Sequence, residues 1–186
     1  MGSFFGMVGN DDVPGFASLP RFSPNLFVGN RYSAAFGDFE VVISTVTPLD
    51  KDGASCEALS THTLLFEDNH GKEAASELEI ARSRIIEGAH LVDAAIRAGK
   101  RTLVHCEWGQ NRSGSICCAY AVLYQGWDPQ EAIEYLQAQN RADRSYIGQT
   151  PMSNKCFNEL ILQLRPHAVT GCGDEAPVDA EARPAR

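Results

Sequence analysis

The residues best suited to chemistry lie in one short stretch, VHCEWGQNRSG, which runs from Val104 to Gly114. It places Cys106 and Arg112 with five residues between them, directly after an apolar run. A glycine-containing loop between a strand and a helix presents backbone amides to an anion, and the helix N-terminus adds partial positive charge. The planar guanidinium of Arg112 can hold two oxygens of a phosphate. We therefore expect an anion-binding loop built for a phosphate group.

A cysteine at the base of such a loop can act as a nucleophile. The amides that bind phosphate also stabilise a thiolate, which is the reactive form of cysteine. Attack by Cys106 on phosphorus would give a cysteinyl-phosphate that water then hydrolyses. Ser113 can donate a hydrogen bond to the departing sulfur, or it can simply cap the helix that follows. The leaving oxygen needs a proton, which a carboxylic acid on a neighbouring loop can supply.

The elements that must position these residues alternate along the chain. Short apolar runs rich in β-branched residues predict strands at 25–30, 39–46, 62–68 and 101–105. Apolar residues recurring every three or four positions predict a long helix over 74–98. A buried helix follows the motif and stops at Gly126, a third begins with Asp128 as its N-cap, and a fourth begins near Ser153.

This alternation predicts a single α/β domain. We expect a central, mostly parallel, twisted sheet of about five strands with helices on both faces. The domain is expected to span residues 18–166, preceded by a loosely attached arm at 1–17 and followed by a disordered acidic tail at 167–186.

Bulk properties narrow the class of partner. The net charge of −8 argues against a nucleic-acid backbone or an anionic membrane as the main partner. The six cysteines show no paired metal-ligand spacing and no disulfide framework, so we expect no metal and no other cofactor. Without a signal peptide or a membrane-spanning run, we expect a cytoplasmic or nuclear location.

The motif HCEWGQNRSG resembles the HCxxGxxRS signature of the cysteine-dependent protein phosphatases, above all the small atypical dual-specificity phosphatases. Several flanking stretches over roughly residues 20–165 are similar to the same family. They are PNLFVGNRYSA, VVISTVT, LLFEDN, GKRTLVHC, AIEYLQAQNR and SNKCFNELIL. The resemblance implies that the chain hydrolyses phosphotyrosine and phosphoserine or phosphothreonine in a phosphorylated protein substrate.

The resemblance also assigns roles to residues. It implies that Cys106 is the nucleophile, Arg112 the phosphate clamp, Ser113 the leaving-group helper and Asp68 the general acid, while His105 tunes the thiolate. The remaining candidate substrate-binding residues are those of the loop and one second anion site: Glu107, Trp108, Gly109, Gln110, Asn111 and Arg141.

Simpler interpretations stay open for several of these residues. Asp68 can be an ordinary loop carboxylate, with Glu67 as the alternative acid, and His105 can satisfy a core hydrogen bond. Trp108 can line the substrate rim or merely cover the loop, and Arg144 competes with Arg141. Cys56 is a candidate thiol partner for oxidised Cys106, whereas Cys117 and Cys118 are expected in the core.

Two other functions remain alternatives. A non-protein substrate, either a phosphoinositide or an RNA 5′-triphosphate, would use the same loop, although the loop adds no lysine for extra phosphates. A phospho-binding pseudophosphatase would be expected to lack the nucleophile, and this chain retains Cys106 and Arg112.

Overall fold

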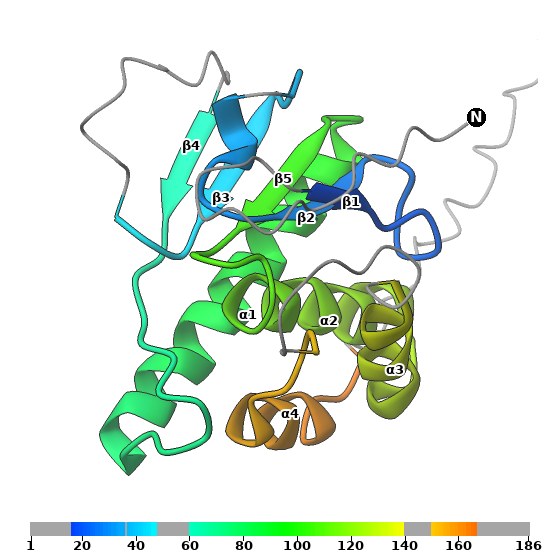
Figure 1. The fold of residues 1–186 in the computed structure, drawn as a ribbon. Coiled ribbons are helices and arrows are strands. Elements are labelled where there is room, and N and C mark those ends of the chain that lie inside the picture. The colour runs from blue at the N-terminus through cyan, green and yellow to red at the C-terminus, as the bar shows by residue number, and fades with distance from the viewer. Residues whose placement is uncertain (1–15, 36, 48–59, 140–149, 167–186) are drawn as a thin grey trace, which may run out of the picture.

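A five-stranded sheet and four α-helices form the domain (Figure 1), in a computed structural model that describes residues 16–35, 37–47, 60–139 and 150–166. The strands are β1 (Phe16–Ser18), β2 (Leu26–Gly29), β3 (Val41–Ser44), β4 (Ser60–Thr63) and β5 (Thr102–His105). The helices are α1 (Ala75–Arg97), α2 (Arg112–Gln125), α3 (Pro129–Gln139) and α4 (Lys155–Leu162), with a short 3₁₀ helix at Ser33–Ala35. The predicted α/β class and five-stranded sheet are confirmed.

The sheet brings the ends of three strands together. Its order is β1-β2-β5-β3-β4, with β2, β5, β3 and β4 parallel and β1 antiparallel to β2. All four residues of β5 are buried, as expected for a central strand. His105 pairs with Gly29 of β2 and with Ser44 of β3, so these three strands end side by side. In open α/β sheets this carboxyl edge is where ligands bind.

Two strand predictions need correction. Phe16 and Ala17 belong to β1 and pair with Gly29 and Val28, so an arm that reaches residue 17 is wrong. Three residues at a sheet edge carry too short a pattern to be recognised. The strand predicted over 62–68 is β4, which ends at Thr63; beyond it the chain keeps a strand-like alternation, with Leu64 and Phe66 buried.

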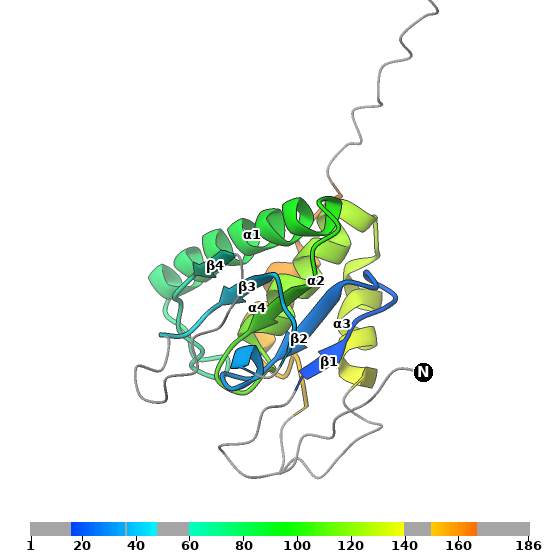
Figure 2. The ribbon, with the colours of Figure 1, turned by 90° about the horizontal axis from the view of Figure 1, so that it is seen from above.

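All four α-helices lie on one face of the sheet (Figures 1 and 2). Among the described residues, the opposite face carries a small cluster of Phe39, Val42 and Leu103, with Phe16 and Phe27 packed against it. The rings of Phe16 and Phe39 meet edge to face with centroids 5.2 Å apart. Aromatic side chains therefore pack on this face near β1, β2 and β3, where the sequence predicted helices, whereas Thr61 of β4, which pairs with Val42, is exposed.

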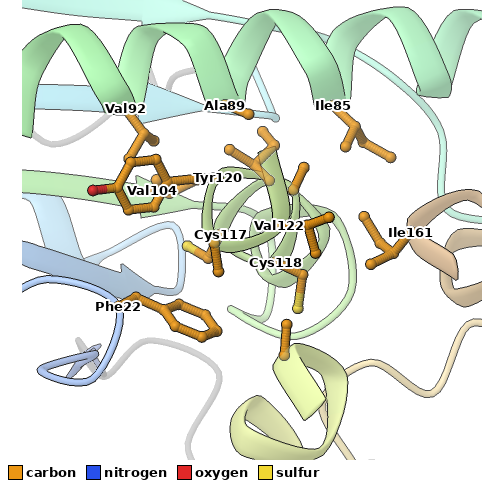
Figure 3. Packing of buried hydrophobic residues seen from close by; sticks show 14 of the residues in the cluster. Phe22, Ile85, Ala89, Val92, Val104, Cys117, Cys118, Tyr120, Val122 and Ile161 are labelled. Carbon is orange, nitrogen blue, oxygen red and sulfur yellow. The ribbon is translucent and has the colours of Figure 1, made fainter. Parts of the chain in front are cut away.

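Helix α2 is the centre of the core, as its uniformly apolar sequence predicted. Figure 3 shows it enclosed by α1, α3, α4 and β5. Cys117, Cys118 and Tyr120 are fully buried, which confirms the prediction that the two cysteines belong to the core. Burial, with a smaller contribution from Cys106, raises the pKa of the Cys117 thiol far above its ordinary value. Gly126, at φ 70°, ends the helix.

The other helix predictions hold closely. The helix expected over 74–98 is α1, and Asp128 caps α3 by accepting hydrogen bonds from the backbone N–H of Gln130 at 2.9 Å and of Glu131 at 3.2 Å. No helix in the described part of the chain is both long and apolar enough to span a membrane.

Candidate active site

The loop between β5 and α2 holds Cys106 and Arg112 at the carboxyl edge of the sheet. Gly109 turns this loop with φ 71°, a backbone conformation that favours glycine. A Cβ atom on Gly109 would lie 2.8 Å from the carbonyl carbon of Gly29. The loop therefore lies directly against the end of β2, and only glycine fits at this contact.

The Cys106 sulfur is buried at the base of the loop, with 2% of the residue exposed. It accepts hydrogen bonds from the backbone N–H of Gly109 at 3.2 Å and from the Ser113 hydroxyl at 3.3 Å. Ser113 is not the helix cap, because α2 begins at Arg112 and Asn111 occupies the cap position. Its hydroxyl is instead directed at the sulfur, where donors stabilise negative charge.

Arg112 links the loop to the ends of two further strands. Its guanidinium donates to the carbonyl of Thr45 at 3.5 Å, just after β3, and to the carbonyl of Phe66 at 3.3 Å, just after β4. Its Nε is buried and has no hydrogen-bond partner in the described part of the chain. The guanidinium is thus anchored to the segments that follow β3 and β4.

His105 is a buried residue at the end of β5. Burial, together with the positive charge of Arg31, lowers the pKa of its ring to about 4, against a weaker opposing hydrogen bond with the Cys106 backbone. The ring is therefore neutral at neutral pH. It can influence Cys106 through packing and hydrogen bonding, but it does not place a cation beside the sulfur.

The next two loop residues face outward. The Glu107 carboxylate forms an ion pair with Arg31 at 2.7 Å, so its charge is matched by a residue that follows β2. Trp108 is 41% exposed, which places it on the surface of the loop. This exposure agrees with a rim position better than with a cover packed over the loop.

Gln110 and Asn111, by contrast, turn inward and are 3% and 2% exposed. Asn111 Oδ1 accepts hydrogen bonds from the backbone N–H of Ser153 at 2.9 Å and of Asn154 at 3.2 Å. The Asn111 side chain thus connects the loop to the start of α4. The sequence predicted Asn111 as a substrate-binding residue and did not predict this structural contact.

Asp68 lies in the segment that follows β4, two residues after the Phe66 carbonyl held by Arg112. Its Oδ1 accepts hydrogen bonds from Asn154 Nδ2 at 2.9 Å and from the backbone N–H of His70 at 3.3 Å. Glu67, the alternative acid, is exposed. Arg141, Arg144 and Cys56 lie outside the described residues.

Sequence reasoning missed the residues that other segments bring to the site. Arg31 and Thr45 follow β2 and β3, and Asn154 caps α4. The polar turn after each strand was a usable signal, but only the strand order shows that these turns meet at one edge. The described residues include no group of three His, Cys, Asp or Glu side chains able to hold a metal ion.

A mostly parallel sheet whose central strand ends in a Cys-x5-Arg loop, with the arginine opening a buried helix, defines the cysteine-dependent phosphatase class. The family model "Dual specificity phosphatase, catalytic domain" matches residues 36–159, which is more than half of the chain. The chain belongs to this family.

Individual relatives agree with this assignment. Dual specificity protein phosphatase 5 of Rattus norvegicus is 29% identical over 118 residues, covering 61% of this chain and 29% of the relative. The chain spans less than half the length of the curated relatives it matches. Among solved structures, human DUSP28 superposes with a TM-score of 0.55 at 19% identity, over 78% of this chain and 93% of that one. PTPMT1 in complex with PI(5)P gives 0.53 at 16%, over 78% and 94%. These structural similarities show the fold.

Proposed function

We propose that this chain is a phosphatase that hydrolyses phosphotyrosine and phosphoserine or phosphothreonine in proteins through a cysteinyl-phosphate intermediate. The observation that carries the proposal is the arrangement around the Cys106 sulfur, with the Gly109 N–H and the Ser113 hydroxyl directed at it. Arg112 stands in the first turn of α2, where its guanidinium and the helix N-terminus both favour an anion.

In the first step the Cys106 thiolate attacks phosphorus and the bond from phosphorus to the substrate oxygen breaks. Asp68 gives its proton to that leaving oxygen, and Arg112 with the loop amides holds the remaining phosphate oxygens. In the second step water attacks phosphorus, its proton passes to the Asp68 carboxylate, and the sulfur leaves as a thiolate. The Ser113 hydroxyl stabilises this thiolate by its hydrogen bond.

The loop side chains favour a protein substrate over a polyphosphorylated one. The positions between Cys106 and Arg112 include no lysine or arginine, and the only charged side chain among them, Glu107, is paired with Arg31. A headgroup with several phosphates would need added positive charge at the rim. The exposed Trp108 offers an aromatic surface for the side chain that carries the phosphate.

A phosphate-release panel tests the proposal. Phosphotyrosine and phosphothreonine peptides, a phosphoinositide and an RNA 5′-triphosphate are incubated with the wild type and with Cys106→Ser, Asp68→Asn and Glu67→Gln. We expect release from both peptides, none with Cys106→Ser, and a loss of about 10²–10⁴-fold on the phosphotyrosine peptide with Asp68→Asn. Glu67→Gln is the matched control and should resemble the wild type.

Each alternative has its own outcome in this panel. Release from the lipid or the RNA alone would overturn the substrate class while keeping the nucleophile. Full activity of Asp68→Asn together with a crippled Glu67→Gln would move the acid to Glu67. A folded wild type that binds phosphopeptide and releases nothing would show a pseudophosphatase.

A further inference from the structure

Asn154 stands where the phosphate-binding loop, helix α4 and the segment carrying Asp68 meet. Only 1% of the residue is exposed. Its backbone N–H donates to Asn111 Oδ1 at 3.2 Å, which ties it to the loop between Cys106 and Arg112. The position of Asn154 is therefore set by the same loop that holds the nucleophile.

The orientation of the Asn154 amide is determined by its partners. Oδ1 accepts hydrogen bonds from the backbone N–H of Cys156 at 3.0 Å and of Phe157 at 3.3 Å, which makes it the N-cap of α4. Only an oxygen can accept from these two donors, so the NH₂ group must point the other way. That NH₂ donates to Asp68 Oδ1 at 2.9 Å and to Glu73 Oε1 at 2.5 Å.

Glu73 fixes the turn that carries Asp68. Its Oε1 also accepts hydrogen bonds from the backbone N–H of Asn69 at 2.9 Å and of Gly71 at 3.5 Å. Burial opposes the ionisation of Glu73, but hydrogen bonds from Asn154 and from backbone groups outweigh it and lower the pKa of its carboxyl. Within this turn His70 adopts φ 56°, a conformation that non-glycine residues rarely take. The surrounding hydrogen bonds therefore maintain a backbone conformation that is unfavourable for histidine.

These contacts also distinguish the two oxygens of Asp68. Oδ1 accepts from Asn154 Nδ2 and from the backbone N–H of His70. An oxygen that receives two N–H donors is a poor place for a proton, so the proton of the acid form belongs on Oδ2. Only that oxygen is then able to pass its proton to a leaving group.

We propose that Asn154 is a positioning residue for the general acid, which sets the place of the Asp68 carboxyl relative to the phosphate-binding loop and keeps its transferable proton on Oδ2. This inference rests on the proposed function, and in particular on Asp68 as the acid. Asn154 acts through Asp68 and does not itself contact the reacting atoms.

The test uses Asn154→Ser, because serine keeps an N-cap oxygen for α4 and lacks the amide NH₂ that reaches the two carboxylates. Asn158→Ser is the matched control: Asn158 also lies on α4, and its Nδ2 donates to the Met152 carbonyl at 3.0 Å rather than to a carboxylate. Both variants are also measured for thermal unfolding, so that lost stability is not mistaken for a lost catalytic contact.

The readout is the dependence of kcat/KM on the leaving group, because kcat/KM reports the steps up to departure of the leaving group and not the later hydrolysis that all substrates share. It is measured with p-nitrophenyl phosphate, which needs little protonation, and with phenyl phosphate and a phosphotyrosine peptide, which need more. We expect Asn154→Ser to reduce turnover of the last two by about tenfold or more while largely sparing the first. In an Asp68→Asn background, Asn154→Ser should cause no further leaving-group-dependent loss, since both changes remove the same proton transfer.

Equal losses on all three substrates, or a full additional loss in the Asp68→Asn background, would overturn the inference and leave Asn154 with a structural role. The same follows if Asn158→Ser reproduces the leaving-group effect. Failure of the proposed function has a different signature, because a wild type that releases no phosphate, or an Asp68→Asn variant with full activity, refutes the acid before Asn154 is considered.

Discussion

At the scale of single residues, the described groups that hydrogen-bond the Cys106 sulfur carry no charge. Cys106 receives its hydrogen bonds from a neutral amide and a neutral hydroxyl. Arg31 is paired with Glu107, and burial keeps the ring of His105 neutral near pH 7. Arg112 is therefore the charged group that the loop offers to a phosphate dianion, and binding strength depends on its geometry.

The buried ring of His105 predicts a pH dependence of stability. Its pKa is about 4 in the folded chain, against an ordinary value of 6.5. Between these values the unfolded chain binds a proton that the folded chain does not, so the free energy of unfolding falls as pH is lowered through this window. The full difference is worth roughly 3 kcal/mol. Denaturant unfolding of the wild type and of His105→Asn measures it, and the variant should show a shallower decline.

His70→Asn is the control for that measurement. His70 is exposed, and asparagine tolerates its positive φ better than most residues. This variant should keep the slope of the wild type. A His105→Asn variant that declines in parallel with the wild type would show that another group causes the acid sensitivity.

The site was predictable from sequence where its residues are contiguous. Cys106, Arg112 and Ser113 share one loop and helix start, so their spacing alone indicates their chemistry. The sequence predicts only that Asn154 belongs to a helix, because its contact with Asp68 spans 86 positions and depends on how α4 packs. Contacts of this kind depend on which elements pack together in the fold, and the spacing of residues in the sequence does not show this.

At the scale of elements, α1 and α2 pack closely against each other in the core. Gly88 lies on α1 against Ile116 of α2, and a Cβ atom on Gly88 would come within 2.7 Å of the Ile116 Cδ1. The absence of a side chain at Gly88 therefore lets the two helices approach. Because α2 begins at Arg112, this contact helps to set where the guanidinium lies.

Gly88→Ala should consequently destabilise the domain. Overpacking a core contact costs about 1–3 kcal/mol, and the better helix propensity of alanine returns up to about 1 kcal/mol. We expect a net loss of up to about 2 kcal/mol in the free energy of unfolding. Ile116→Val removes the nearest methyl group, so the double variant should recover part of the loss. An additive double variant would show that Ile116 does not carry the strain.

The bounds of an element were predictable where its side-chain pattern ends with its hydrogen bonding, as in β5, predicted over 101–105 and found at Thr102–His105. The helix α1 runs from Ala75 to Arg97, and its repeat located it within a residue at each end. β1 has three residues, and the predicted arm includes the first two of them. The strand predicted over 62–68 starts two residues later than β4 and ends five residues later, because the buried Leu64 and Phe66 continue the alternation beyond Thr63. Hydrogen bonding, rather than side-chain pattern, decides where such short strands end.

At the scale of the whole molecule, the net charge of −8 affects which substrates approach the site. An acidic surface repels an acidic peptide and attracts a basic one over distances of about 10 Å at 0.1 M salt. The loop itself does not oppose this preference, since its only carboxylate, Glu107, is neutralised by Arg31. Electrostatics should therefore favour phosphopeptides with basic flanking residues.

Two peptides with the same phosphotyrosine core, one flanked by arginines and the other by glutamates, test this preference through kcat/KM. We expect the basic peptide to be favoured by about tenfold at low ionic strength, and the ratio to approach one as salt rises to about 0.5 M, because screening weakens long-range attraction. The salt dependence separates this effect from a specific pocket, whose contacts would persist. A ratio that salt does not change, or a preference for the acidic peptide, would show that local contacts outside the loop govern substrate choice in place of the overall charge.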